Sequence, residues 1–159
     1  MSNQPGIRFS IKTVFDESQL KNMVNKLPEY KKAANRQAGF AILEDIGDRF
    51  ENQGSPPAKW KPLKESTLKR IVKQYGPGPH MILNRNGNLK NSWMVGDPDN
   101  VFRVTTNRVV VGTRLVYAAP HQFGWAEKNI PARPMAVDPD QSPELLSKLE
   151  KIYGALLQT

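Results

Sequence analysis

The sequence has no cysteine and only two histidines, His80 and His121, and none of its apolar runs approaches the roughly 20 residues of a membrane-spanning helix. The lack of cysteine excludes a disulfide framework, a thiolate nucleophile and a cysteine zinc site. Residues 1–6 are polar, unlike the apolar core of a secretion signal. At 159 residues the chain suits one domain, residues 1–159. We therefore expect a single-domain protein made in the cytoplasm, with no membrane partner.

Acidic residues are also scarce. The chain has 15 Asp and Glu against 23 Lys and Arg, a formal charge of +8. Residues 1–91 hold 16 basic and 8 acidic side chains, whereas residues 92–159 hold 7 of each, so the excess lies in the first part. This asymmetry predicts a polyanion or an acidic protein surface as a neighbour.

The hydrophobic patterns predict an α+β fold, in which a small antiparallel sheet is covered by a long helix and a C-terminal helix. Strands are expected at residues 7–13, in a hairpin of 101–105 with 109–113, and as short segments at 93–95 and 135–137. Helices are expected at residues 18–27, 28–50, 66–75, 117–124 and 142–157. Pro28 should separate the first two helices, and Ser142 should cap the last. Loops rich in proline and glycine, 52–62 and 76–81, should project.

The sequence offers little for catalysis. A nucleophilic site needs a base and an orienting group, and His121 has no evident acid partner, so we expect it to bond to backbone at a helix end. Glu44, Asp45 and Asp48 are better explained as a solvated helix side near Arg49 than as a metal site. Prolines exclude a phosphate-binding loop at residues 76–79. We predict no enzymatic activity, no cofactor and no metal.

One stretch has a strong charge excess. Residues 59–90 contain eight Lys and Arg and one acid, Glu65, with Trp60 and Tyr75 between them. A solvated helix face explains this charge in an isolated domain, whereas sequence-independent contact with DNA is the functional alternative. The candidate contacts with DNA or an acidic partner are Lys59, Lys61, Lys64, Lys69, Arg70 and Lys73.

Four short landmarks occur in an order that resembles the phage virion morphogenesis family, the tail-completion proteins of Mu-like and related tailed phages. The landmarks are a loop segment, a glycine turn, a YAAPHQFG segment and an IPARP segment. Their residues are Gly54, Pro57, Trp60, Leu63 and Thr67; Gly87 and Leu89; Tyr117, Ala118, His121, Gln122, Phe123 and Gly124; and Pro131, Arg133 and Pro134. The resemblance extends from about residue 27 to the C-terminus.

The resemblance implies a structural neck protein that completes the tail or joins it to the head. It would form a homo-oligomeric ring, for example a hexamer, around the DNA path in the virion. Its partners would be copies of itself, other neck, connector and tail-terminator proteins, and passing DNA. The alternatives from other classes are a sequence-independent nucleic-acid-binding protein and a small nuclease or hydrolase.

The local chemistry of these segments also gives expectations for individual side chains. Trp60 and Leu63 should be at least half buried, because an indole beside a proline-rich loop has much apolar area to bury. Residues 76–79 should be exposed or held by another subunit. Arg133 offers a planar fork of donors to a carboxylate or a carbonyl, either within the chain or between subunits.

Overall fold

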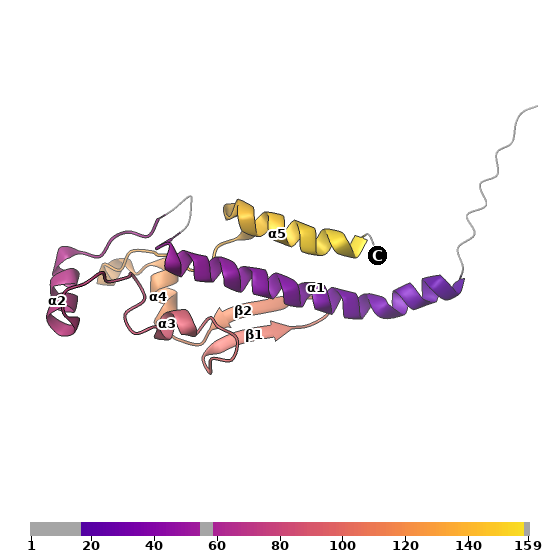
Figure 1. The fold of residues 1–159 in the computed structure, drawn as a ribbon, viewed down its shortest axis with the longest axis horizontal. Coiled ribbons are helices and arrows are strands. Elements are labelled where there is room, and N and C mark those ends of the chain that lie inside the picture. Colours follow the sequence, from indigo (N-terminus) through magenta and orange to yellow (C-terminus); the bar gives the residue numbers. More distant parts are fainter. Residues whose placement is uncertain (1–16, 55–58, 158–159) are drawn as a thin grey trace, which may run out of the picture.

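The computed structural model describes residues 17–54 and 59–157 and has an α+β fold, which confirms the predicted class (Figure 1). The predicted strand at residues 7–13 lies outside the described part of the chain. The longer elements are α1 (Glu17–Glu51), α2 (Glu65–Tyr75), β1 (Asn100–Val104), β2 (Val109–Thr113) and α5 (Pro143–Gly154). The short ones are α3 (Asn88–Asn91), α4 (Ala118–Phe123), and the 3₁₀ turns η1 (Ala126–Lys128), η2 (Pro139–Gln141) and η3 (Ala155–Leu157).

Helix α1 is continuous through Pro28, so the prediction of two helices separated by this proline is wrong. A proline inside a helix removes one backbone hydrogen bond and costs about 3 kcal/mol. Residues 21–33 are all exposed, so water can satisfy the carbonyl that loses its partner. These residues are exposed because the N-terminal part of α1 extends beyond the rest of the molecule (Figure 1).

The predicted hairpin is confirmed, with Asn100 paired to Thr113 and Val104 to Val109 in an antiparallel register. It packs closely on α1 at Gly39, where a Cβ atom would lie 2.6 Å from the Phe102 side chain. Phe40 stacks on Phe102 with ring centroids 5.1 Å apart. The absence of a side chain at Gly39 thus sets how near the hairpin approaches the helix.

Helix α5 packs on the opposite side of α1 from the hairpin, so it covers α1 rather than the sheet directly (Figure 1). Its predicted stripe is confirmed, with Leu145 buried and Leu149, Ile152 and Leu156 partly buried. Asn35 of α1 links the layers, because it accepts a hydrogen bond from Tyr153 Oη and donates to the Thr105 and Thr106 carbonyls.

Two predicted strands are absent from the described residues, and Ser142 does not cap α5 with its side chain. Residues 93–95 form turns with local hydrogen bonds, such as Met94 N–H to Asn91 O. Residues 135–136 are bonded by the Gln122 side chain instead of a neighbouring strand. The Ser142 hydroxyl donates to Asp45 Oδ1 of α1 at 2.8 Å. The groups that bond to residues 93–95, 135–136 and Ser142 lie in a local turn or far away in the sequence. A short apolar pattern does not predict such hydrogen-bond partners.

The hydrophobic core lies where the C-terminal part of α1 meets the segments after it. Its buried members are Ile46, Phe50, Trp60, Leu89, Trp93, Ala118 and Met135. Leu83 packs at its edge. The core therefore joins the last turns of α1 to the landmark segments.

Candidate functional site

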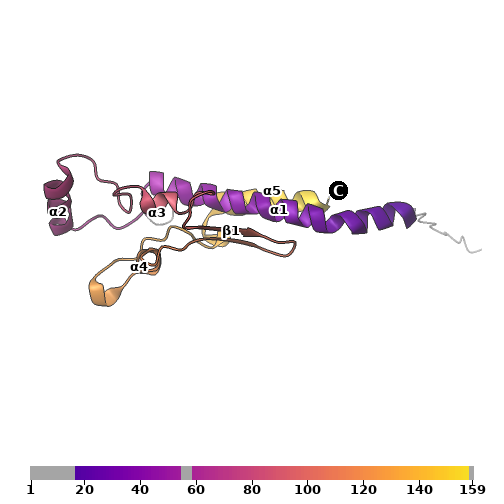
Figure 2. The same cartoon turned by 90° about the horizontal axis from the view of Figure 1, so that it is seen from below.

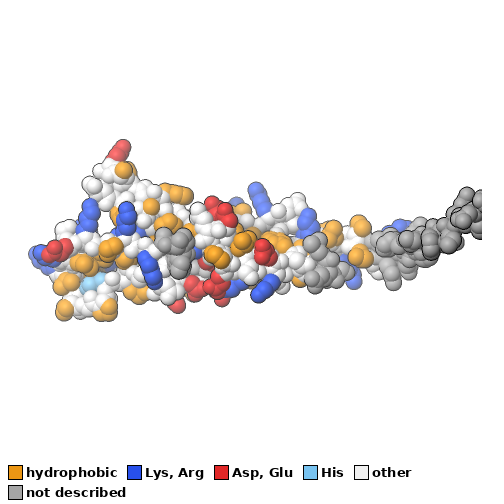
Figure 3. Space-filling view, turned by 90° about the horizontal axis from the view of Figure 1, so that it is seen from above, with side chains coloured by type: hydrophobic (Ala, Val, Ile, Leu, Met, Phe, Trp, Pro, Cys, Tyr) orange, Lys and Arg blue, Asp and Glu red, His pale blue; other side chains and the backbone are white. Residues whose placement is uncertain are grey.

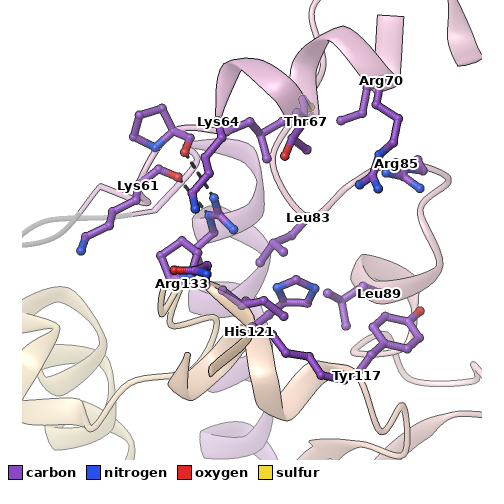
Figure 4. Close-up of a pocket in the computed structure, with 18 of the residues that line it drawn as sticks. Lys61, Lys64, Thr67, Arg70, Leu83, Arg85, Leu89, Tyr117, His121 and Arg133 are labelled. Carbon is purple, nitrogen blue, oxygen red and sulfur yellow. Dashed lines mark hydrogen bonds between the residues drawn. The ribbon is translucent and has the colours of Figure 1, made fainter. Parts of the chain in front are cut away.

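Two arms project from the core, one carrying α2 and the other carrying α4 and the turn after it (Figure 2). A large open hollow lies between them (Figure 4). Its volume is about 1210 Å³. Its lining comes from residues 61–71, 81–89, 117–121 and 126–133, which are far apart in sequence. All four landmark segments contribute to it.

The α2 arm forms the first wall. The predicted helix is confirmed and ends at Gly76, whose φ is +85°. Thr67 and Arg70 of its inner side line the hollow beside the buried Ile71. The remaining apolar residues of α2 face outward and are exposed, namely Leu68, Val72 and Tyr75. Of residues 76–79, which were predicted to be exposed, residues 77–79 are exposed and Gly76 is partly buried.

Trp60 fixes the base of this arm to the core, as predicted. It is 5% exposed, and its indole N–H donates to the Pro134 carbonyl at 2.9 Å. The ring meets Phe50 edge to face, with centroids 5.4 Å apart. Leu63 is partly buried and lines the hollow. Gly54 ends the turn after α1 at φ +93°, and Pro57 lies outside the described residues.

Arg133 locks the extended 130–134 segment against the α2 arm. Its side chain is buried, and Nε and Nη2 donate to the carbonyls of Lys61 at 3.0 Å and Pro62 at 3.3 Å (Figure 4). Burial lowers the pKa of the guanidinium, which stays charged because its ordinary value is so high. The predicted donor fork thus binds carbonyls within the chain.

The α4 arm forms the opposite wall, and its backbone position depends on Gln122 and Gly124. The Gln122 side chain makes the hydrogen bonds that a neighbouring strand would otherwise make. Its amide oxygen accepts from the backbone N–H groups of Met135 and Ala136, and its amide nitrogen donates to the Ala136 carbonyl. Gly124 ends α4 at φ +81°, as predicted, and a Cβ there would lie 3.0 Å from the Ala132 nitrogen. The preceding Phe123 is 79% exposed.

Within the described residues the His121 ring forms no hydrogen bond to backbone, so that expectation is wrong. The imidazole Nδ1 is buried there without a partner, and the backbone carbonyl of His121 accepts a hydrogen bond from Arg133 N–H at 2.7 Å. Burial lowers the pKa of His121, and the nearby positive charge of Arg133 lowers it further. His121 is therefore held neutral at the floor of the hollow, beside Leu89 (Figure 4).

This environment predicts a pH-dependent stability. The unfolded chain should bind a proton at His121 more tightly than the folded chain, so acidification through the ordinary imidazole range should favour unfolding. We expect the free energy of unfolding to fall from pH 7 to pH 5, at no more than about 1.4 kcal/mol per pH unit for this one group. His121→Gln should flatten the profile, measured by urea titration, whereas His80→Gln should retain it. A His121→Gln profile equal to that of the wild type would contradict this.

The hollow has a one-sided charge. Among the residues that the structure describes, no acidic side chain lines it. The cationic side chains that do so are Lys61, Lys64, Arg70, Arg85, Lys128 and Arg133. Acidic side chains are seen instead over the middle of the molecule (Figure 3). Glu44 of α1 and Glu144 of α5 both pair with Lys148. Burial raises the pKa of Asp48 in that region, and Glu44 adds to the effect. Within the described residues no group of three or more His, Asp or Glu is arranged to hold a metal ion.

The structure separates the six basic residues that the sequence offered as contacts with DNA or an acidic partner into two groups of three. Lys61, Lys64 and Arg70 line the hollow, whereas Lys59, Lys69 and Lys73 do not. Lys69 pairs with Glu65, and Lys59 donates to the Asn52 carbonyl. Among the landmark residues, Leu63, Thr67, Leu89, Tyr117, His121, Pro131 and Arg133 meet at the hollow. Gly87 begins α3 at φ +80°, and Ala118 lies in the core.

Sequence reasoning did not single out Arg85 and Lys128 as part of this site. Arg85 lies over the Tyr75 ring at 5.5 Å, and Lys128 lies over the Trp125 ring at 4.1 Å. Both are single basic residues in turns, with no periodic pattern around them. Only the folding of two distant segments onto the core brings them to one surface.

The fold and this surface define the chain as an α+β protein with a basic, partly apolar hollow. The chain belongs to the phage virion morphogenesis family, whose model matches residues 15–152, so it is a phage structural or morphogenesis protein. It is also 28% identical over 109 residues to the uncharacterized protein MJ0331 of Methanocaldococcus jannaschii, covering 67% of this chain and 76% of that protein. No solved structure shows a significant match. No helix of the described residues is both long and apolar enough to cross a membrane.

Proposed function

We propose that the chain is a neck or tail-completion component of a tailed-phage virion, and that its copies form a ring around the DNA path. The observation that carries the proposal is the pair of arms, which project with large apolar side chains uncovered. Val72 and Tyr75 on α2 are 40% and 51% exposed, and Phe123 on the other arm is 79% exposed. Apolar groups gathered on projecting arms are typical of surfaces that bind other proteins.

A ring gives every subunit two neighbours, and each stable interface typically buries about 800 Å² per partner. Two arms and a long helix that extends beyond the body provide such area on a small domain (Figures 1 and 2). Connector and tail-terminator proteins would contact the faces of the ring. In this proposal the chain works by assembly rather than by turnover.

Lys69 and Lys73 lie on α2 outside the hollow, and we propose that they face the DNA in the lumen. Both are exposed, and mobile lysines suit weak, exchangeable contact with passing phosphates better than base readout does. Each phosphate neutralised adds about 0.9 to the slope of log affinity against log salt. DNA binding should therefore be independent of sequence and steeply dependent on salt.

Charge reversal of these two lysines tests whether they face DNA in the lumen. Lys69→Glu combined with Lys73→Glu should lower the salt slope for duplex DNA by about 2 and impair DNA retention in particles, while rings still form. Arg108→Glu with Lys151→Glu is the matched control, because both side chains are exposed and lie in the hairpin turn and α5, outside the two arms and the projecting part of α1. It should change neither the salt slope nor DNA retention. Particles that package, retain and eject DNA normally with the α2 variant would exclude the lumen role.

The same measurements distinguish the ring proposal from the alternative function, nucleic-acid binding. A chain that stays monomeric and yet binds duplex DNA with the full salt slope would instead be a sequence-independent nucleic-acid-binding protein. A variant that fails only in neck assembly would place Lys69 and Lys73 against an acidic protein neighbour.

A further inference from the structure

The cations of the hollow have no anionic partners within the described chain. None of the six forms an ion pair, whereas Arg49, Lys69, Lys90 and Lys148 outside the hollow all contact carboxylates. Like charges gathered around a concave surface repel one another and raise the local concentration of anions. The hollow therefore carries a positive charge that no described side chain of the same subunit neutralises.

The arrangement of charge and apolar surface limits what can fill the hollow. Arg70 and Arg85 lie at one end and Lys61, Lys64 and Arg133 at the other, with Leu83 between the two groups (Figure 4). Leu89 and Tyr117 add apolar surface below Arg85 in the same view. A volume of about 1210 Å³ exceeds the range of most small-molecule pockets. An acidic protein segment with some apolar surface fits this pattern better than a small anion does.

The chain itself carries such a segment at residues 138–144. Asp138, Asp140 and Glu144 are exposed, and no Lys or Arg occurs between Arg133 and Lys148. Neither Asp138 nor Asp140 forms an ion pair in the described structure. None of these residues lines the hollow of its own subunit.

This acidic segment is also held in place at both ends. Just before the segment, the Gln122 side chain bonds to the backbone of Met135 and Ala136. Inside the segment, the Ser142 hydroxyl donates to Asp45 of α1. Between these anchors the chain makes the short turn η2, which contains Pro139. A segment that is already ordered loses little conformational entropy when it binds.

We infer that the hollow of one subunit receives the acidic segment 138–144 of a second copy. The inference rests on the proposed ring and names one of its contacts. Hollow and segment are different surfaces of the same chain, so the contact is heterologous, and heterologous contacts generate rings when the rotation closes. A DNA backbone or an acidic segment of another virion protein would offer similar charge, but neither supplies the repeated contact that a ring of identical subunits requires.

Charge exchange between the two surfaces tests the inference. The hollow variant is Arg70→Glu with Arg85→Glu, and the segment variant is Asp138→Lys with Asp140→Lys. All four side chains are exposed, so the variants should fold, which circular dichroism can verify. Each variant alone should weaken self-association at least about tenfold, and the four substitutions together should restore it to within about threefold, measured by sedimentation at low salt.

The controls separate this contact from the ring itself. Lys69→Glu with Lys73→Glu also reverses two positive charges, on α2 beside Arg70 but outside the hollow, and should leave self-association intact. If the wild type forms rings but neither variant weakens them, or the combined variant fails to restore them, the inference is wrong and the ring proposal stands. A wild type that remains monomeric would overturn both. If the hollow variant instead loses only DNA binding, the anion in the hollow is DNA and the inference is wrong.

Discussion

Replacing Trp60 with alanine is expected to lower the free energy of unfolding by about 3–5 kcal/mol, as for other large aromatic residues removed from a core. The indole is 5% exposed, packs edge to face on Phe50 and donates to the Pro134 carbonyl. Its loss leaves a cavity and an unpaired backbone acceptor where the α2 arm joins the core. Urea denaturation gives the value directly.

Two further substitutions make the Trp60 result specific. Trp60→Phe keeps most of the packing but loses the hydrogen bond, so it should cost about 1–3 kcal/mol. Trp125→Ala removes an indole that is 38% exposed on the α4 arm and should cost clearly less than Trp60→Ala. A loss below about 1 kcal/mol for Trp60→Ala would mean that this arm is not anchored through the indole.

Replacing Gly124 with alanine is expected to have the second-largest effect. Its φ of +81° and ψ of +163° fall in a region used almost only by glycine, and a side chain there costs about 1–3 kcal/mol through the backbone alone. The added Cβ would also lie 3.0 Å from the Ala132 nitrogen and 3.3 Å from the Ile130 oxygen. We expect the turn between Trp125 and Ile130 to open, which faster hydrogen exchange of their amides would report.

Gly47→Ala is the matched control for Gly124. Gly47 lies inside α1, and a Cβ there would meet nothing within 4 Å. Alanine is favoured over glycine in a helix by about 1 kcal/mol, so this variant should be slightly more stable than the wild type. Equal stability of the Gly124→Ala variant and the wild type would show that the turn adapts without strain.

Elements with strong local signals could be predicted from the sequence. The 101–113 hairpin, the end of α2 at Gly76 and the end of α4 at Gly124 follow from alternation and glycine, and α5 follows from its leucine spacing. Pro28 was misleading because its helix is exposed, and water can replace the lost partner of the carbonyl. Residues 135–136 were misleading because a glutamine side chain takes the place of a strand.

The hollow could not be predicted in the same way, since it depends on contacts between distant segments. The sequence indicated the basic stretch and singled out Arg133 as a donor fork, but not that Arg133 bonds to the carbonyls of Lys61 and Pro62. That contact spans about 70 residues and involves backbone acceptors, which have no sequence signature. Arg85 and Lys128 line the same hollow although they are 43 residues apart in the sequence.

The central claim is that the chain is built into the virion at the junction of head and tail. The most direct measurement is to locate a labelled copy in purified particles by electron microscopy and to count copies per particle by quantitative mass spectrometry. We predict several copies per particle, all at the junction and around the DNA path. Finished particles that lack the chain, or that carry it elsewhere, would contradict the proposal.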